Sequence, residues 1–276
     1  MGVRFIERSV GRFTKKHGHK PFVLITGGSS GMGFQYALLF AKAECPMLIV
    51  SNRENELEES ASQLRREYNA QVLTRFQDLA TDNASQELFD YCKASGLQID
   101  ILINNAGMFF WTQATTVNMP RFDTMIRLHV LTNTNNTILF GNDMKERGYG
   151  YILNISSMAS TFPLPGITAY AATKAYLKSF SRSMYFELRP FGVSVTTVCP
   201  AAVATPLYRL SPKLMNIGVK CKVINTPQWL VKKAVTGMFR KRRTMKPGFQ
   251  NYYLPPIVSA LPKWSVNKLW KKYKDL

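Results

Sequence analysis

Short apolar runs alternate with longer polar segments from residue 21 onward, and within the polar segments apolar residues recur every three or four positions. This alternation predicts strands that alternate with helices. The runs that predict strands span residues 22–26, 47–51, 71–76, 101–104, 150–156 and 193–199. Several are continuous stretches of Ile, Val and Leu, which favours a parallel sheet buried on both faces. Segments such as 55–68 and 83–95 have the length of crossover helices, so we predict a doubly wound α/β sheet.

The alternation ends near Pro206. Residues 207–223 show no clear periodicity, whereas residues 228–239 predict a helix with Thr226 as its N-cap and Pro227 at its first position. Beyond residue 240 we recognise no seventh strand, and no internal repeat or linker divides the chain. We therefore expect a single domain whose last sheet edge is undefined.

Charge is concentrated at the two ends of the chain. The 276 residues include 36 Lys and Arg against 17 Asp and Glu, which gives a net charge of +19. Residues 1–20 carry +5 and residues 206–276 carry +15, but residues 21–205 carry only −1. The excess charge therefore points to an anionic partner for the ends and says little about the chemistry of the central body.

Composition excludes several classes of protein. With 46% hydrophobic residues and dispersed Gly and Pro, the chain is not collagen-like, low-complexity or a coiled coil. No apolar run approaches the length of a membrane span, and no secretory signal is visible. Its four cysteines show no Cys-x-x-Cys spacing, which favours a reducing, cytoplasmic compartment. We expect no metal site.

A glycine-rich turn follows the first predicted strand. Its residues are Gly27, Gly28, Ser29, Ser30, Gly31, Met32 and Gly33, and a helix-like segment comes next. Such a turn brings backbone N–H groups close to a pyrophosphate at the positive end of a helix. An ordinary tight turn also uses glycine, but the position between strand and helix favours a dinucleotide site.

The second strand ends in Val50-Ser51-Asn52-Arg53. Domains that bind NAD usually place a carboxylate here for the ribose 2′-hydroxyl group, and this chain has none. The guanidinium of Arg53 instead suits a 2′-phosphate, so we expect NADP(H) to be preferred over NAD(H). The alternative is a solvated Arg53 beside Glu54 and Glu56.

Three polar motifs follow later strands. Asn104-Asn105-Ala106-Gly107 ends the fourth strand, Ser157 follows the fifth, and Tyr170 precedes Lys174 by four residues on a predicted helix. On a helix, side chains four residues apart share one face and can contact the same bound molecule. Tyr170 and Lys174 are therefore candidates for one site.

These motifs, in this order and spacing, resemble those of the short-chain dehydrogenase/reductase family, over about residues 21–205. The resemblance implies a Rossmann-type fold and NAD(P)-dependent interconversion of an alcohol and a carbonyl. It implies that Tyr170 is the proton donor, that Lys174 lowers the tyrosine pKa and holds the nicotinamide ribose, and that Ser157 binds the substrate oxygen. It also places further residues on the cofactor: Asp78 and Leu79 at the adenine, Asn105, Ala106 and Gly107 in support, and Pro200, Val203 and Thr205 beside the nicotinamide. For Asp78 a turn cap is the alternative.

The chain departs from the family pattern at the usual catalytic Asn, where the alignment places His129. Histidine can donate and accept hydrogen bonds and titrates near neutrality, so we expect an altered proton relay through His129. A buried, satisfied histidine is the alternative. A second departure is Pro200-Ala201, where Pro-Gly is common.

The region after Thr205 is the substrate lid in this family. Its many apolar residues suggest a bulky apolar substrate, although they could also simply cover the core. The list is Leu207, Tyr208, Leu210, Leu214, Met215, Ile217, Val219, Val223 and Ile224. The segment 226–234 and the basic tail are similar to the branch that holds 17β-hydroxysteroid dehydrogenases, long-chain 3-oxoacyl reductases and, nearby, 3-ketosphinganine reductases.

Both ends of the chain read as basic amphipathic helices. In residues 263–276 one face carries Val266, Leu269, Trp270, Tyr273 and Leu276, and in the N-terminal segment Val3, Ile6, Val10 and Phe13 alternate with arginines. This pattern is typical of peripheral binding to an anionic membrane. We divide the chain into a basic N-terminal extension (1–20), an NADP-binding catalytic domain (21–256) with its lid (206–225), and a basic amphipathic tail (257–276).

Two other functions compete with a membrane-associated ketone reductase. Residues 240–243 are all basic and could bind nucleic acid, but no recognition motif accompanies them. A catalytically silent NADP-binding sensor would not need Ser157, Tyr170 and Lys174 together. The family resemblance further implies a homodimer.

Overall fold

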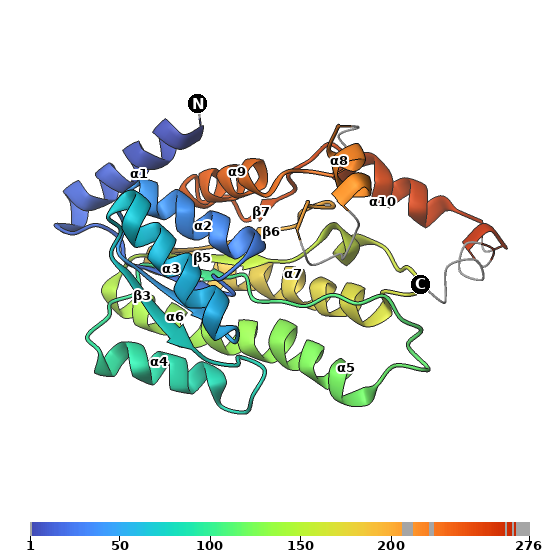
Figure 1. Cartoon of the computed structure of the whole chain (residues 1–276), viewed down its shortest axis with the longest axis horizontal. Helices are drawn as coiled ribbons and strands as arrows, with labels where there is room; N and C mark the ends of the chain where they lie inside the picture. The colour runs from blue at the N-terminus through green and yellow to red at the C-terminus, as the bar shows by residue number, and fades with distance from the viewer. Residues whose placement is uncertain (1, 206–211, 221–223, 263, 267, 269–276) are drawn as a thin grey trace.

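We describe a computed structural model of the chain, covering residues 2–205, 212–220, 224–262, 264–266 and 268. Its centre is a parallel sheet with strand order β3-β2-β1-β4-β5-β6-β7 (Figure 1). The strands are β1 (Val23–Thr26), β2 (Met47–Ser51), β3 (Val72–Phe76), β4 (Ile101–Asn104), β5 (Gly150–Ile155), β6 (Val193–Val198) and β7 (Thr244–Met245). The doubly wound sheet is confirmed, and each of the six predicted strands lies within one residue of its predicted bounds.

The sheet also has the seventh strand that the sequence did not reveal. β7 is two residues long and pairs in parallel with the end of β6, with Thr244 opposite Thr197 and Met245 opposite Val198. The sheet edge that the sequence left undefined beyond residue 240 is therefore formed by this short strand. A two-residue strand with partly exposed side chains has no apolar run by which it could be recognised.

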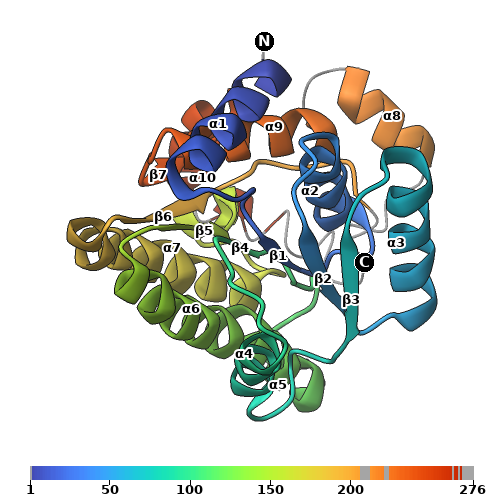
Figure 2. The same ribbon diagram turned by 90° about the vertical axis from the view of Figure 1, so that its left-hand side faces the viewer.

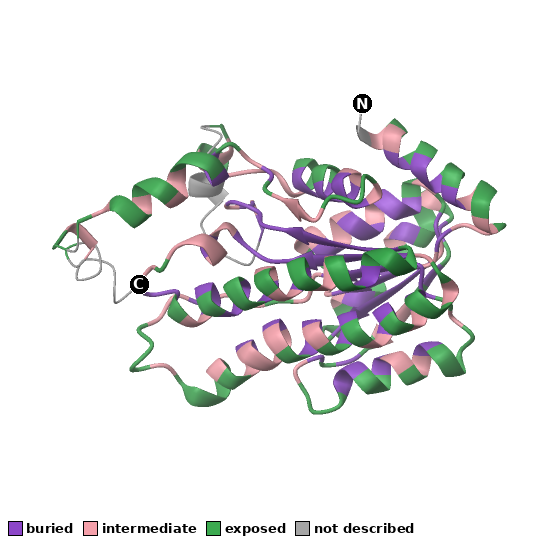
Figure 3. Cartoon of the chain, turned by 180° about the vertical axis from the view of Figure 1, so that it is seen from behind, coloured by how far each residue is buried: buried purple, intermediate pink, exposed green. Residues whose placement is uncertain are grey.

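Helices cover both faces of the sheet (Figure 2). On one face lie α1 (Gly2–His17), α2 (Gly31–Lys42), α3 (Glu54–Tyr68) and α9 (Pro227–Phe239), and on the other α4 (Ala84–Ala94), α6 (Asn133–Arg147) and α7 (Thr168–Leu188). The remaining elements are α5 (Met119–Ile126), a π-helix (Arg127–Thr132), two 3-10 turns (Met158–Thr161 and Arg189–Phe191), α8 (Pro212–Lys220) and α10 (Gln250–Ala260). Figure 3 shows the inner strands buried and the helices that cover the sheet buried along their inner sides.

The predicted cap of α9 is confirmed. The side chain of Thr226 accepts a hydrogen bond from the backbone N–H of Trp229 at 3.4 Å, and Pro227 occupies the first helical position. Proline has no N–H to leave unsatisfied at this position, so Thr226 and Pro227 together define where the helix begins.

The N-terminal extension is helical, as predicted, but its apolar face is not available to a membrane. Ile6, Val10 and Phe13 are buried, and α1 packs against α9. The catalytic domain itself covers these side chains, so they are not free to contact a membrane. The arginines of α1 remain on its outer side.

Parts of the predicted lid and tail lie outside the described residues. They are Leu207, Tyr208, Leu210 and Val223 in the lid and Leu269, Trp270, Tyr273 and Leu276 in the tail, and the side chains of Leu214 and Met215 are also not described. Within the described residues, no helix has the length and apolar character needed to cross a bilayer.

Candidate active site

A cavity of about 460 Å³ lies where the strands end at their carboxyl termini, the usual place for a ligand in an open α/β sheet. It is lined by nearly all of the site residues expected from the sequence. They are Gly27, Ser29, Ser30, Gly31, Met32, Arg53, Asp78, Leu79, Asn105, Ala106, Gly107, His129, Ser157, Tyr170, Lys174, Pro200, Val203 and Thr205. The structure thus brings together residues that lie as far apart as 27 and 205 in the sequence.

Gly33 does not line the cavity, and its role is to allow close packing. A Cβ atom at this position would lie 1.8 Å from the carbonyl oxygen of Gly27. Helix α2 can therefore lie directly against the turn only because Gly33 has no side chain. Gly27 and Gly31 adopt φ of +64° and +55°, which favours glycine.

The turn is held in place from strand β4. The hydroxyl oxygen of Thr26 accepts hydrogen bonds from the backbone N–H groups of Asn105 and Ala106, each at 3.0 Å. The side-chain amide of Asn105 in turn donates to the carbonyl oxygens of Thr26 and Gly27 at 3.1 Å. These bonds hold the glycine turn at the N-terminus of α2. A helix N-terminus presents backbone N–H groups that favour an anionic group.

The end of β2 forms the other side of the cavity. Ser51 and Ser29 share a hydroxyl–hydroxyl hydrogen bond of 2.8 Å, and the hydroxyl of Ser60 donates to the carbonyl oxygen of Ser29 at 2.7 Å. Arg53 lines the cavity, but its guanidinium donates to Glu56 at 2.8 Å and its side chain is 64% exposed. The guanidinium can therefore exchange this solvent-exposed partner for a bound anion at little cost.

Asp78 lies in the cavity wall and also acts as a turn cap. Its carboxylate accepts a hydrogen bond from the backbone N–H of Ala80 at 2.9 Å. The capping interpretation and the adenine interpretation are therefore compatible at this residue.

Helix α7 presents Tyr170 and Lys174 to the cavity one turn apart. The lysine Nζ atom lies 5.7 Å from the centroid of the tyrosine ring and donates to the carbonyl oxygen of Ile155 at 2.9 Å. Burial lowers the pKa of Lys174 to about 8. At neutral pH the lysine is thus still charged, and a cation this close favours the phenolate form of a tyrosine.

Ser157 comes to the same place from the end of β5. Its hydroxyl oxygen accepts a hydrogen bond from the backbone N–H of Ala159 at 3.1 Å, and its side chain is buried. The bond leaves the hydroxyl hydrogen available for a substrate oxygen. The ring of Phe109 stands edge-on to Tyr170 at 5.0 Å between centroids and gives this end an apolar wall.

His129 is fully buried and both ring nitrogens are engaged. Nε2 accepts a hydrogen bond from the backbone N–H of Met108 at 3.0 Å, so the ring proton is on Nδ1, which lies 3.1 Å from the hydroxyl of Thr173. The hydroxyl of Thr173 donates onward to the carbonyl oxygen of Tyr170. Burial and the charge of Lys174 lower the pKa of His129 well below 6.5. The surroundings of His129 therefore favour the neutral ring and disfavour the titration near neutrality that the sequence led us to expect.

A buried amide network behind the cavity ties its supporting elements together. Asn104 donates to Asn154 at 2.9 Å, Asn154 donates to Ser181 at 2.9 Å, and Asn136 donates to Asn104 at 3.1 Å. These residues belong to β4, β5, α7 and α6. Buried networks of hydrogen bonds rigidify their surroundings, so the network ties α7 to the sheet.

The sequence did not predict several residues of the cavity wall, including Gln77, Met108, Phe109 and Arg121. They come from loops and from the start of α5, where no motif or periodicity marks them. Arg121 places a second guanidinium in the wall, over the ring of Phe110 at 4.5 Å. Among the described residues no group of His, Cys, Asp and Glu could hold a metal ion.

Comparison with known proteins agrees with this geometry. The family model for short chain dehydrogenase matches residues 21–213. The curated very-long-chain 3-oxoacyl-CoA reductases of Homo sapiens and Macaca fascicularis are each 31% identical over 255 residues, which cover 90% of this chain and 78% of theirs.

Two solved structures are similar in fold and sequence. A short-chain dehydrogenase from Sphingobium yanoikuyae in complex with NADPH has a TM-score of 0.75 and 27% identity, covering 88% of this chain and 97% of its own. The bulky-bulky ketone specific alcohol dehydrogenase from Comamonas testosteroni has a TM-score of 0.72 and 28% identity, covering 91% of each chain. With its glycine turn, its Ser157, Tyr170 and Lys174 on one cavity and these relatives, the chain belongs to the short chain dehydrogenase family of oxidoreductases that act on CH–OH groups.

Proposed function

We propose that the protein uses NADP(H) to interconvert a ketone and a secondary alcohol on a bulky apolar substrate, with a 3-oxoacyl thioester as the favoured class. The observation that carries this proposal is one cavity with the glycine turn and Arg53 at one end and Ser157, Tyr170 and Lys174 at the other. A 3-ketosphinganine-like or steroid ketone has the same chemistry and enters as a competitor in the assay.

The residues present fit a dinucleotide. The turn from Gly27 to Gly33 has no room for side chains where helix α2 meets it, which leaves its backbone free to approach a pyrophosphate. Lys174 would hold the nicotinamide ribose. When bound, the cofactor supplies hydride transfer.

The preference for NADP(H) rests on the end of β2. No carboxylate stands at the end of this strand to bind a ribose 2′-hydroxyl group, and Arg53 is the cation nearest in sequence. A 2′-phosphate would replace Glu56 as the partner of Arg53, and a doubly charged phosphate offers a planar guanidinium the stronger interaction. The NADPH complex of the Sphingobium yanoikuyae relative supports this assignment.

Tyr170 is the proposed proton donor in the direction of reduction. Its hydroxyl gives a proton to the substrate oxygen, and the charge of Lys174 stabilises the phenolate that remains. Ser157 donates a second hydrogen bond to the same oxygen while negative charge develops on it. In oxidation each of these transfers runs backward.

His129 is proposed as a positioning residue. Neutral, and bonded to the backbone N–H of Met108 and to Thr173, it connects the loop after β4 with helix α7. This connection holds the Tyr170 backbone through Thr173. We therefore propose a positioning role for His129 in place of the proton relay expected from the sequence.

The apolar substrate is supported by the cavity wall and by the relatives. Met108 and Phe109 line the end of the cavity that holds Tyr170, and α8 of the lid carries an exposed Ile217. The relatives named for very-long-chain 3-oxoacyl-CoA and for bulky-bulky ketones support a large substrate.

A homodimer and a cytoplasmic location, peripheral to a membrane, belong to the same proposal. Four large apolar side chains are exposed along the π-helix, α6 and α7: Leu131, Ile138, Tyr176 and Phe186. A second copy of the chain would cover them. Sedimentation equilibrium that gives a monomer at micromolar protein would refute the dimer.

The test of the activity is NADPH oxidation with 3-oxoacyl thioesters of increasing chain length, beside a steroid ketone and 3-ketosphinganine. We expect kcat/KM to rise with chain length and to be higher with NADPH than with NADH. NADPH binding without turnover of any of these ketones would instead indicate the catalytically silent sensor.

A further inference from the structure

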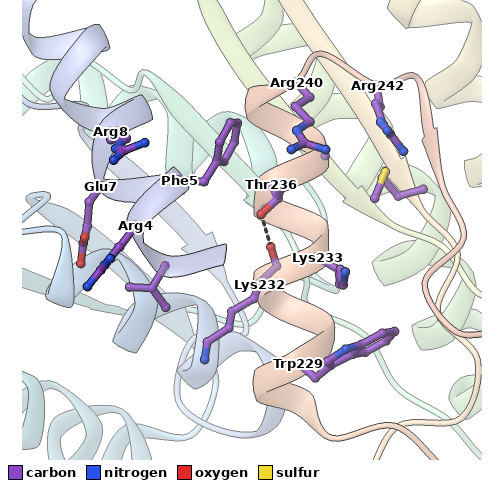
Figure 4. A pocket seen from close by; sticks show the side chains of 13 residues that line it. Arg4, Phe5, Glu7, Arg8, Trp229, Lys232, Lys233, Thr236, Arg240 and Arg242 are labelled. Carbon is purple, nitrogen blue, oxygen red and sulfur yellow. Dashed lines mark hydrogen bonds between the residues drawn. The ribbon is translucent and has the colours of Figure 1, made fainter. Parts of the chain in front are cut away.

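A basic groove lies between α1 and α9, on the outer side of the molecule and apart from the catalytic cavity (Figure 4). Its volume is about 1350 Å³. Six cationic side chains line it: Arg4, Arg8, Lys232, Lys233, Arg240 and Arg242. The one acidic residue in the wall is Glu7. The basic groove therefore has a strong excess of positive charge.

The cations of the basic groove have no carboxylate partners among the described residues. Elsewhere in the structure basic side chains form ion pairs, such as Lys93 with Asp143 at 2.8 Å. In the groove Arg240 lies over the ring of Phe5 at 4.9 Å and Lys233 lies 5.9 Å from the ring of Trp229. These contacts orient the cations without neutralising them, so their charge is available to an anion from outside.

A further feature that favours an external anion is the position of Arg4 at the N-terminus of α1. Helix α1 has no acidic residue in its first turn, and Arg4 stands there instead. A cation near a helix N-terminus opposes the helix dipole and lowers stability. An external anion at this end of α1 would relieve both the dipole and the clustered charge.

An aromatic patch extends the same side of the molecule. The patch consists of Phe249, Tyr252, Ile257 and Trp264, whose exposed fractions are 78%, 65%, 54% and 69%. Figures 1 and 2 place α1, α9, α8 and α10 in the upper half of the molecule, with α4 and α5 at the bottom, and in Figure 1 α1 and α10 lie toward opposite ends of the long axis. Tyrosine and tryptophan favour the boundary between water and lipid, and cations favour anionic headgroups.

We propose that this side docks on an anionic bilayer, with lipid headgroups in the basic groove and the aromatic patch of α10 at the level of the interface. Charge complementarity identifies the occupant, since the groove presents six cations to a surface whose phosphates and carboxylates are dense. The exposed Ile257 and Phe249 of the aromatic patch match the apolar region beneath the headgroups. The docking rests on the membrane location of the proposed function and not on the proposed reaction.

Co-sedimentation of the full chain with vesicles tests the proposal. We expect binding to vesicles of mixed phosphatidylcholine and phosphatidylserine at low salt, and little to phosphatidylcholine alone. Because each cation near such a surface contributes about fivefold to binding, Arg4→Gln with Arg8→Gln should lower the partition coefficient about 25-fold. Lys232→Gln with Lys233→Gln, on the other helix, should do the same, so the test survives if one pair fails to fold.

The matched control is Arg66→Gln with Lys145→Gln. It removes the same charge from α3 and α6, outside the basic groove, and should leave vesicle binding nearly unchanged. Equal losses in the control and in the groove pairs would overturn the proposal, as would equal binding to the two kinds of vesicle.

Two further comparisons identify the partner. Tyr252→Ser with Ile257→Ser should weaken binding to vesicles, and binding of a single-stranded oligonucleotide by the intact chain in place of vesicles would overturn the proposal in favour of nucleic acid. Tyr170→Phe should bind vesicles normally, which separates a failure of docking from a failure of the proposed reaction.

Discussion

The buried charge of Lys174 should cost the protein measurable stability. Burial lowers its pKa from the ordinary 10.5 to about 8. At 1.36 kcal/mol for each pKa unit, this difference corresponds to about 3 kcal/mol of destabilisation at neutral pH. Replacement by Met removes that cost but also the hydrogen bond from the charged Nζ to the carbonyl oxygen of Ile155, which is worth about 1.5–3 kcal/mol. Lys174→Met should therefore gain about 1 kcal/mol at pH 7.

The gain should depend on pH with a definite sign. Below pH 8 the lysine is protonated in both the folded and the unfolded chain, so the full cost is present. Between about 8 and 10.5 the unfolded chain binds more protons than the folded chain, and the stability of the unmodified protein rises with pH. The advantage of Lys174→Met should thus shrink across this range and disappear before pH 10.5, where the remaining burial cost equals the lost hydrogen bond.

Urea unfolding at pH 7, 8, 9 and 10 measures this difference as a free energy of unfolding. Lys232→Met, at an exposed position on α9, is the control and should stay within about 0.5 kcal/mol of the unmodified chain throughout. The reasoning is refuted if Lys174→Met is no more stable at pH 7, or if its gain is the same at pH 7 and pH 10. The stabilised variant should have lost turnover, because Tyr170 then lacks its cation.

Three other substitutions have defined outcomes. Arg53→Glu should shift the ratio of kcat/KM for NADPH and NADH toward NADH by about tenfold or more, since a charged contact to phosphate is worth about 1.5–3 kcal/mol; an unchanged ratio would remove Arg53 from the 2′-phosphate site. Gly33→Ala should cost about 3 kcal/mol or more or abolish cofactor binding, because its Cβ would lie 1.8 Å from the Gly27 oxygen, whereas Gly11→Ala, with nothing within 4 Å, should be harmless in thermal unfolding. His129→Asn should alter the level of turnover but leave its pH profile between 6 and 8 unmoved, because the pKa of His129 is held well below 6.5; a displaced profile would restore a relay that titrates.

The central sheet was predictable chiefly because several of its strands are continuous apolar runs. Burial on both faces of a parallel sheet favours such runs, and β1, β2 and β4 carry them, whereas β3 and β6 contain polar residues. β7 was not predicted, because its two residues, Thr244 and Met245, are too few to show an apolar run or a periodic pattern. The packing of α1 against the domain was not predictable either. An apolar face on a helix indicates that Ile6 and Val10 are covered, but it does not distinguish cover by a protein domain from cover by lipid.

The candidate site was predictable where a motif marks it. Gly31, Tyr170 and Lys174 occur at spacings that chemistry constrains, and the structure gathers them in one cavity. Arg121 lines the same cavity but comes from a segment without a motif, so only the folded arrangement identifies it. The basic groove is a further case, because its cations come from segments more than 200 residues apart, Arg4 among them.

Removal of one hydroxyl group tests the central claim most directly. In single-turnover reduction of a long-chain 3-oxoacyl thioester by bound NADPH, Tyr170→Phe should lower the rate by about 10²- to 10⁴-fold, the usual contribution of a positioned proton donor. NADPH binding, followed by its fluorescence, should be unchanged, because Tyr170 gives up only its proton-donating group. A Tyr170→Phe variant that binds NADPH and reduces the thioester at a rate within about threefold of the unmodified chain would contradict the account.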